Sequence, residues 1–521
     1  MTRALTTFLS LFESFHSSGS VVACAAPFLI TLVLVLFRPS LTRTKLPPGP
    51  MAFPFVGNLL SLPTTQKAQG LRDMEQSKSY GDITYFHGLG QSLVILNNRH
   101  AMSELFIRRS DITGGRPTLT MCGELVGYNK AIVLKQPGKE FREMRKELGA
   151  AVGKGSALSR NKLLRHQELG RYLSNLLETP SLLFEHNRWL IGTYTLSIAY
   201  GYRPTKFNDT FIIAAERALA EFVDLIQPGT WIVDLFPFLK HVVLRLPFTR
   251  YKETISRYQE SQKALSITPF RMVKSQLARG TAPESVCATL INKFPTRSTT
   301  EEDEAYLAWI AGNIYAGGSD TTVSSLCSFY LAMCLSPTAK KKAQAEIDAF
   351  TERMDRFPNA NEKDRCPYIC ALISELYRWA IVAPLGIPHM FTEDVEYNGY
   401  LIPRNTTILV NAWAISQDPE IYPEPDQFRP ERFLGNKQQL DPREYAFGGG
   451  RRLCPGIDLA DTMMFLALSG ILAVFEICPL PSCPLSYAFR DAFSRHPLPF
   501  ECSITVRSSR AQDWINVALA E

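Results

Sequence analysis

The chain has 521 residues, of which 45% are hydrophobic and 20% are charged. This is the composition of an ordinary globular protein, with enough apolar material for a sizeable core. The formal net charge of +6 is small for this length and basic residues are interleaved with acids, which argues against a nucleic-acid partner.

The first feature along the chain is an uncharged apolar stretch, residues 21–37, which reads VVACAAPFLITLVLVLF. Together with Gly19 and Ser20 it is long enough to cross a bilayer. Basic residues follow at once, so the positive-inside rule places the rest of the chain in the cytosol. A cleaved signal peptide is the alternative, but the late start and the basic flank favour an anchor.

Four segments are therefore expected. They are a lumenal segment at 1–20, a transmembrane anchor at 21–37, a basic and proline-rich hinge at 38–50, and one large domain at 51–521. Prolines in the hinge favour a stiff extended segment over a helix.

Within the large domain, residues 80–98 are rich in β-branched and aromatic residues and predict a β hairpin. Hydrophobic periodicity predicts mainly helices over 140–380, with a proline-rich interruption at 228–247. Residues 301–333 are apolar on several faces, which indicates one long buried helix, and 340–350 predict a further amphipathic helix.

The C-terminal part returns to strands. Short strands are predicted at 384–411 and again at 497–506, where the pattern alternates. Between them, the apolar run 463–475 predicts the last helix, packed behind a cysteine loop. The whole pattern predicts a mainly α fold with small β sheets in one large domain, rather than two separable domains.

The middle of the predicted long helix reads AGGSDTT, residues 316–322. Two adjacent glycines inside a helix cost roughly 1 kcal/mol each relative to alanine, which suggests a purpose. Gly317 and Gly318 would open a groove where a flat ligand or O₂ lies against the backbone. The Thr321 hydroxyl can bond to a backbone carbonyl, and Asp320 could relay protons to bound oxygen. The alternative is a small-residue packing site with a solvated aspartate.

A second pattern is Glu375 and Arg378, an acid and a base spaced i, i+3. Such pairs are usually exposed and contribute little to stability. The segment FRPERF at 428–433 follows about 50 residues later.

The third pattern is FGGGRRLCPG, residues 447–456. Three consecutive glycines let the backbone turn tightly, Arg452 can reach an anionic group, and Pro455 fixes φ just after the sulfur of Cys454. A cysteine thiolate in this setting is suited to haem iron. The alternative is a buried free cysteine beside a glycine loop. The 11 cysteines show no zinc-site spacing and favour reduced thiols facing the cytosol.

These patterns together resemble the signatures of the cytochrome P450 family. The haem-ligand pattern FxxGxRxCxG is matched at every specified position of 447–456. Residues 316–322 resemble the oxygen-activation motif, 375–378 the ExxR helix and 428–433 the FxPERF segment. The resemblance covers 47–508, with the motifs in family order, and implies a single P450-type haem domain.

The resemblance implies a set of residue roles. Cys454 would be the axial ligand to the iron of haem b (iron protoporphyrin IX), with Phe447, Gly448, Gly317 and Gly318 also lining the cofactor, and Asp320 and Thr321 would be catalytic. A buried structural triad would be formed by Glu375, Arg378 and Arg432.

Propionate contacts are implied for Arg452, for Arg145 and for His389, with Arg116 as a further candidate. The segment that carries Arg145 departs from the family because Phe141 stands where tryptophan is usual, so one indole N–H donor is lost. His389 is otherwise an ordinary strand residue.

The implied reaction is a monooxygenation that uses O₂ and NADPH. Electrons would arrive singly from NADPH–cytochrome P450 reductase, with cytochrome b5 as a second candidate donor. The chain looks most like fungal membrane-bound members of secondary metabolism, which implies the endoplasmic reticulum membrane and a lipophilic small-molecule substrate, a terpenoid or polyketide. The resemblance places the substrate near Ile314 and Tyr315, 382–385, Phe493 and the segment after Gly114.

Two rival functions are a haem-thiolate isomerase or dehydratase that needs no reductase, and a non-catalytic haem-binding membrane protein. The acid–threonine pair Asp320-Thr321 disfavours both, because members of the family with the first function commonly lack this pair, and a non-catalytic protein would have no use for a proton relay.

Overall fold

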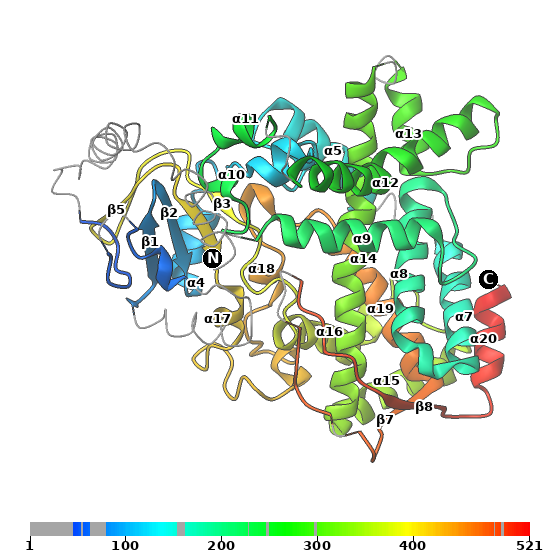
Figure 1. Ribbon diagram of the computed structural model, residues 1–521. Coiled ribbons are helices and arrows are strands. Elements are labelled where there is room, and N and C mark those ends of the chain that lie inside the picture. The colour runs from blue at the N-terminus through cyan, green and yellow to red at the C-terminus, as the bar shows by residue number, and fades with distance from the viewer. Residues whose placement is uncertain are drawn as a thin grey trace, which may run out of the picture.

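The structure is a computed structural model (Figure 1) that describes residues 45–53, 56–62, 80–153, 162–227, 229–245, 250–295, 300–483, 485–490 and 494–520. The expected segment 1–20 and the expected anchor at 21–37 lie outside the described residues. The expected single large domain is described from Met51 onward, and it is mainly helical with small sheets, as predicted.

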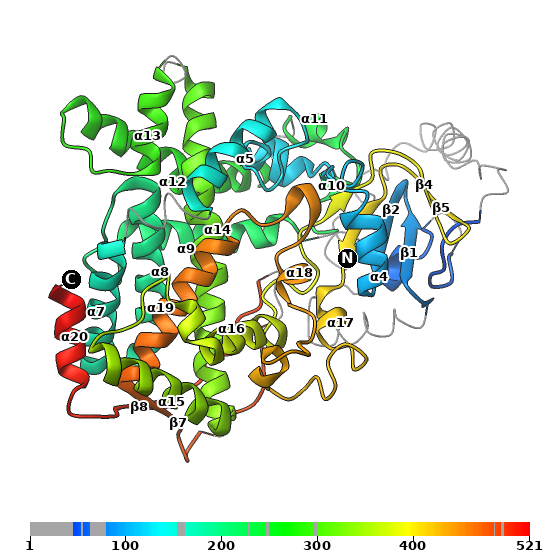
Figure 2. The ribbon, with the colours of Figure 1, turned by 180° about the vertical axis from the view of Figure 1, so that it is seen from behind.

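Helices form most of the molecule (Figures 1 and 2). They are α4 (Arg99–Ala101), α5 (Lys139–Val152), α7 (Lys162–Glu178), α8 (Leu183–Tyr200), α9 (Thr210–Leu225), α10 (Ile232–Leu235), α11 (Leu239–Val243), α12 (Tyr251–Ala278), α13 (Val286–Lys293), α14 (Glu301–Leu335), α15 (Pro337–Met354), α16 (Pro367–Trp379), α17 (Ala412–Ser416), α18 (Arg443–Ala446), α19 (Ile457–Val474) and α20 (Ala511–Ala520). Single π or 3₁₀ turns occur at Leu59–Ser61, Met102–Ile107, Thr120–Leu125, Tyr128–Lys130, Pro180–Leu182, Lys363–Arg365, Pro430–Phe433 and Gly450–Arg452.

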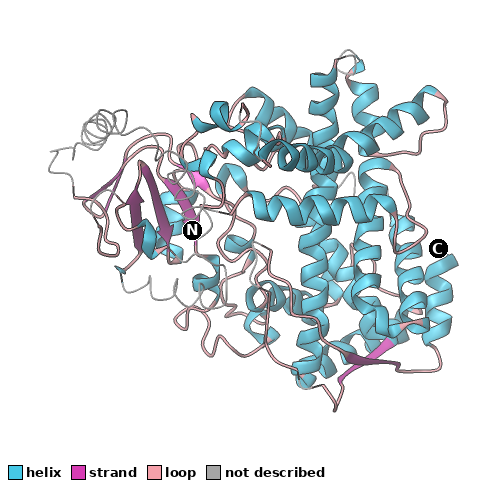
Figure 3. Cartoon of the chain, viewed as in Figure 1, coloured by secondary structure: helices cyan, strands magenta, loops and turns pink. Residues whose placement is uncertain are grey.

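The strands form three small sheets, and the largest lies at one end of the molecule (Figure 3). They are β1 (Ile83–Gly88), β2 (Gln91–Leu96), β3 (His389–Met390), β4 (Val395–Tyr397), β5 (Tyr400–Ile402), β6 (Thr407–Val410), β7 (Phe475–Pro479) and β8 (Cys502–Val506). The largest sheet has the order β1-β2-β6-β3, and β4-β5 and β7-β8 are antiparallel pairs. The predicted hairpin at 80–98 is confirmed as β1 and β2, with Tyr85 opposite Val94.

The predicted long helix is confirmed as α14, which runs through the middle of the helical part (Figures 1 and 2). The Thr300 side chain caps it by accepting a hydrogen bond from the Asp303 N–H, and four acidic residues in the first turn oppose the positive end of the helix dipole. Most of α14 is buried, and it packs against α8, α12 and α13. A helix that is apolar on all sides needs such burial.

The apolar run behind the cysteine loop is α19, which begins directly after Gly456. By length and composition it is the one helix within the described ranges that could cross a membrane, but it is mostly buried inside the protein. The prediction that α19 is the last helix is wrong, since α20 follows β8. Ala511, Trp514, Ile515 and Ala518 form one buried face of α20, which packs on α7.

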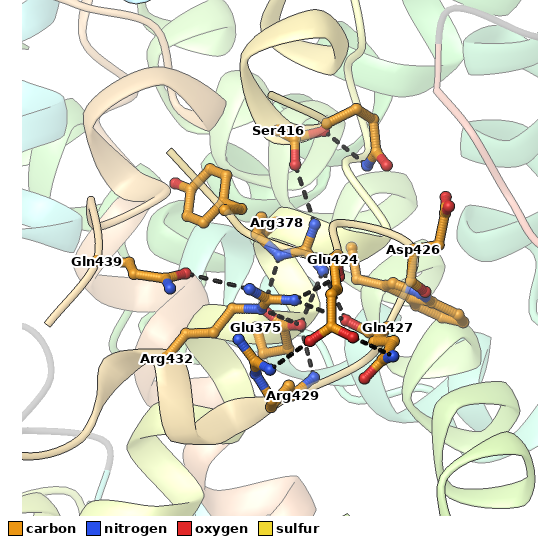
Figure 4. A network of polar contacts seen from close by, with 12 residues as sticks. Glu375, Arg378, Ser416, Glu424, Asp426, Gln427, Arg429, Arg432 and Gln439 are labelled. Atoms are coloured by element: carbon orange, nitrogen blue, oxygen red, sulfur yellow. Dashed lines mark hydrogen bonds and ion pairs between the residues drawn. The ribbon is translucent and has the colours of Figure 1, made fainter. Parts of the chain in front are cut away.

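The three residues predicted to form a structural triad lie together and their side chains are fully buried (Figure 4). Arg378 donates from Nε to Glu375 Oε2 at 2.7 Å and from Nη2 to Oε1 at 2.8 Å. Arg432 Nε reaches the same Oε1 at 3.4 Å, and the Arg429 backbone N–H reaches it at 2.7 Å. One buried carboxylate therefore joins α16 to the segment that carries Arg432.

The two arginines of the triad also hold backbone carbonyls of the intervening chain (Figure 4). Arg378 donates to the carbonyls of Ser416 at 3.0 Å and Gln427 at 3.1 Å, and Arg432 donates to Glu424 at 2.6 Å. The planar guanidinium fork suits this task because it serves several acceptors at once. The triad thus orders the loops that precede Cys454.

We expect Glu375→Gln to lower the free energy of unfolding by about 3–5 kcal/mol, because two buried guanidinium groups lose their charge partner. Guanidinium chloride unfolding followed by circular dichroism measures this. The matched control is Glu424→Gln, which removes the partly exposed Arg429–Glu424 pair and should cost about 1 kcal/mol or less. Equal losses in the two variants would contradict the role of Glu375.

Candidate haem-binding site

The cysteine loop is shaped by its glycines. Gly448 (φ 76°) and Gly450 (φ 56°) adopt left-handed conformations that glycine favours. A Cβ on Gly450 would also lie 2.4 Å from the Cβ of Ser110, so the loop is seated closely against the segment that follows Met102–Ile107. The loop closes through the Cys454 N–H, which donates to the Phe447 carbonyl at 2.9 Å.

Aromatic and charged neighbours surround the cysteine. The ring of Phe447 meets Tyr377 edge to face at 5.1 Å. Burial raises the pKa of Cys454, whereas the Gly456 N–H and the positive charge of Arg145 act to lower it. A nearby cation and a backbone donor are the features that stabilise a thiolate. Binding of a metal ion to the sulfur of Cys454 would add to these two effects and favour the thiolate form.

Arg452 lies across the ring of Phe141, with its Cζ atom 3.8 Å from the ring centroid. It donates to the carbonyls of Gly114 at 2.7 Å, Lys135 at 2.7 Å and Ile132 at 3.2 Å. Phe141 therefore contributes a flat face for the guanidinium group, although it lacks the indole donor. Burial lowers the pKa of Arg452 to about 10, and Arg145 acts in the same direction.

Arg116 and His389 lie beside Arg452. Arg116 is buried, donates to the carbonyls of Ile387 and Pro388, and leaves its Nε without a hydrogen-bond partner. The His389 Nδ1 lies 3.0 Å from the Thr113 carbonyl, and its ring meets Phe106 edge to face. Burial and the charge of Arg116 hold the pKa of His389 well below its usual value.

Arg116, Arg145, Arg452 and His389 thus form a basic cluster in which the three arginines carry the positive charge, and no described carboxylate forms an ion pair with any member. Buried positive charge without a counter-charge is unfavourable, so the cluster suits a ligand that brings anionic groups. The two propionates of haem supply such charges, and Cys454 can supply the thiolate. Across the described ranges, no three His, Cys, Asp or Glu side chains form a separate metal-ion site.

One face of α14 is open in the middle of this otherwise buried helix. Gly317 and Thr321, one turn apart, are both exposed, and a Cβ on Gly317 would meet nothing within 4 Å. The Thr321 hydroxyl donates to the Gly317 carbonyl at 2.8 Å, as the sequence suggested. This face can accommodate a flat ligand, and α14 also packs against α5, which carries Arg145.

Gly318 does not share the open face. A Cβ there would lie 2.9 Å from Cγ2 of Thr195 on α8. The sequence analysis expected both glycines to open one groove, but helix packing explains Gly318 and open space explains Gly317.

Asp320 contacts a side chain from a distant part of the sequence. Its Oδ1 lies 3.0 Å from Nε2 of His496, a residue that sequence reasoning did not assign to the site. Burial on its own would raise the pKa of Asp320, but the hydrogen bond and charge of His496, together with the smaller effects of Ser494 and Arg188, hold this pKa below its usual value. The two residues are 176 positions apart, and no local pattern links them.

The residues expected to line the substrate site stay a prediction, and their surroundings in the structure differ. Ile314 and Tyr315 are buried, and the Tyr315 hydroxyl is engaged with the Phe211 carbonyl, to which it donates at 2.9 Å. The half-buried residues next to Gly317 on that face are Asn313 and Ala316. Phe493 lies outside the described residues.

We expect opposite stability changes at the two glycines. Gly317→Ala should raise the free energy of unfolding by about 0.5–1 kcal/mol, because alanine favours the helix and meets no neighbour. Gly318→Ala should lower it by about 1–2 kcal/mol through overpacking against Thr195. Adding Thr195→Ser removes the clashing methyl group and should restore most of that loss. Stabilisation by both alanines would contradict the assignment, and thermal unfolding measures each variant.

Comparison with known proteins gives the family that the sequence motifs resemble. Residues 47–504 match the cytochrome P450 family. Cytochrome P450 monooxygenase claR of Ampulloclitocybe clavipes is 37% identical, covering 91% of this chain and 89% of that protein. Cytochrome P450 monooxygenase 208 of Postia placenta is 35% identical, covering 94% and 96%. Tryptamine 4-monooxygenase of Psilocybe cyanescens is 33% identical, covering 89% and 94%.

The match spans nearly the whole described domain and extends to relatives along most of their length. Haem, O₂ and a reductase-supplied electron donor are common to this family, and the basic cluster and the open face of α14 fit the cofactor. The chain therefore belongs to the cytochrome P450 family and is a monooxygenase of that family.

Proposed function

We propose that this protein is a reductase-dependent haem-thiolate monooxygenase of a lipophilic small molecule. The observation that carries the proposal is the basic cluster without counter-charge near Cys454 and the adjoining open face of α14. NADPH–cytochrome P450 reductase is the proposed electron donor, with cytochrome b5 as a second one.

In this proposal Cys454 binds the iron as a thiolate, and Arg145 helps to keep the sulfur ionised. Arg116, Arg452 and His389 bind the propionates. When bound, the haem supplies the oxygen-activating chemistry. Gly317 leaves room beside the helix backbone, and Thr321 and Asp320 hold and pass protons toward that space.

The proposed substrate is a terpenoid or polyketide of fungal secondary metabolism. Support comes from the relatives, which are fungal monooxygenases, and from the half-buried apolar residues Val382, Ala383 and Ala316. One relative is named for the oxidation of tryptamine, so an indole amine belongs in the same test.

The proposed location is the endoplasmic reticulum membrane, with one anchor at 21–37 and the catalytic domain in the cytosol. The uncharged stretch and its basic flank support this orientation. If deletion of residues 1–37 left the protein in the membrane fraction, the anchor would be elsewhere.

The substrate proposal is tested with purified protein, reductase, NADPH and a panel of terpenoids, polyketides, tryptamine, fatty acids and sterols. Oxidised terpenoid or polyketide products are expected. Turnover of fatty acids or sterols alone would overturn the substrate class. Turnover of any compound without NADPH would instead favour a haem-thiolate isomerase or dehydratase.

We expect Cys454→Ala to abolish the strongly red-shifted Soret band of the reduced carbon monoxide complex, because that band requires a thiolate ligand. The control is Cys370→Ala, which removes a half-buried thiol on α16 and should keep the band. The band is measured by difference spectroscopy after dithionite reduction. Its persistence in Cys454→Ala would mean that another residue binds the iron.

A further inference from the structure

The C-terminal segment brings a histidine against the open region of α14. His496 Nε2 lies 3.0 Å from Asp320 Oδ1. The backbone around His496 is fixed on both sides, because the Arg495 N–H donates to the Val382 carbonyl at 2.8 Å and the Arg490 N–H donates to the His496 carbonyl at 2.7 Å. The imidazole is therefore held by a fixed segment, rather than by a free surface loop.

A second contact ties the same segment to the same helix. The Ser324 hydroxyl, one turn after Asp320, donates to the Arg495 carbonyl. Two neighbouring residues of the segment thus meet two positions of α14 that are one turn apart, which fixes their mutual register. This placement aims the ring of His496 at Asp320.

The other charged groups near Asp320 are committed elsewhere. Arg188 on α8 adds positive charge near the carboxylate, but its Nε pairs with Glu216 on α9 at 3.3 Å and its Nη1 lies 4.0 Å from Glu185. Glu216 is itself a negative neighbour of Asp320. Arg188 therefore acts on Asp320 through charge at a distance, whereas His496 contacts an oxygen atom directly.

A fixed carboxylate matters because Asp320 adjoins Thr321. The Thr321 hydroxyl is already held by its bond to the Gly317 carbonyl at 2.8 Å. An aspartate side chain that is partly exposed can rotate among several rotamers. A proton relay requires its groups within hydrogen-bond reach, and displacement by about 1 Å can cost about 100-fold in rate.

We propose that His496 is the positioning residue of Asp320: its Nε2–H donates to Oδ1 and holds the carboxylate in the orientation that serves Thr321. This inference rests on the proposed function, in which Asp320 passes protons during oxygen activation. His496 acts through Asp320 and is not assigned contact with substrate or haem.

The test compares His496→Ala, His496→Gln, Asp320→Asn and the double variant His496→Ala/Asp320→Asn in the full-length holoenzyme. The probes are NADPH, O₂ and reductase, and the readout is hydrogen peroxide released per NADPH oxidised, which needs no identified substrate. When protons are not delivered to reduced oxygen in the right place, it escapes as hydrogen peroxide. His496→Ala should therefore slow NADPH-dependent turnover to water or product by about 10-fold and raise the hydrogen peroxide released per NADPH oxidised.

Two comparisons separate positioning from general damage. His496→Gln keeps an N–H donor near the position of Nε2 and should restore turnover to within about 2-fold of wild type, since it retains the hydrogen bond. The double variant should equal Asp320→Asn alone, because His496 acts only through that carboxylate. The matched control is His100→Ala, an exposed histidine whose Nδ1 lies 3.8 Å from Asp82, and it should behave as wild type.

Several outcomes overturn the inference. They are a peroxide share in His496→Ala no higher than in His100→Ala, no rescue by glutamine, or a double variant clearly worse than Asp320→Asn. Failure of the proposed function looks different, because wild-type protein would then oxidise no NADPH with reductase. In that case the same four variants are compared by thermal unfolding of the haem-loaded protein, and additive effects of the two single changes would overturn the pairing itself.

Discussion

The order of the chain that leads toward the cysteine loop depends on one buried carboxylate, that of Glu375. An acid removed from water is tolerated only where donors satisfy it, and its donors come both from its own helix and from residues more than 50 positions later. Glu375 is therefore satisfied only when the segment containing Arg429 and Arg432 is docked. Arg378 and Arg432, which both contact Glu375, also hold carbonyls between Ser416 and Gln427, so one acid orders a long irregular stretch of chain.

The protein treats its buried positive charges in two contrasting ways. Arg378 and Arg432 have an internal counter-charge, whereas Arg116, Arg145 and Arg452 have backbone carbonyls, an aromatic face or no hydrogen-bond partner within the described residues. The first group stabilises the fold without a ligand. The second group lowers the stability of the fold, because its buried charges lack a counter-charge. An anionic cofactor can offset this loss, and haem binding is therefore coupled to stability. Substitution of Trp by Phe at position 141 fits this arrangement, since the ring still supports Arg452.

The sequence predicted those parts of the site that depend on contiguous patterns. The loop around Cys454, the long helix and the Glu375–Arg378 spacing are local, and the structure brings the triad together as expected. Three features were not predictable in the same way. Gly318 and Gly317 are neighbours in one motif, but only three-dimensional packing separates their roles. Helix α20 is short, and its apolar face is buried only because α7 packs against it, a contact that the local sequence does not reveal. His496 approaches Asp320 from a distant segment.

The contact with His496 shows why the helix motif alone does not determine how the Asp320 side chain is held. Within α14, Asp320 and Ser324 are one turn apart. The facing segment runs in the opposite direction, so that His496 contacts Asp320 and Arg495 contacts Ser324. A shift of the segment by one residue would move the imidazole away from Oδ1 and replace it with a proline or an arginine side chain. The chemistry of the acid thus depends on the register between two segments, and the backbone contacts of Arg495 with Ser324 and Val382 hold that register. Two chains with identical helix motifs can therefore differ in how their acid is held, because the determining residue lies outside the motif.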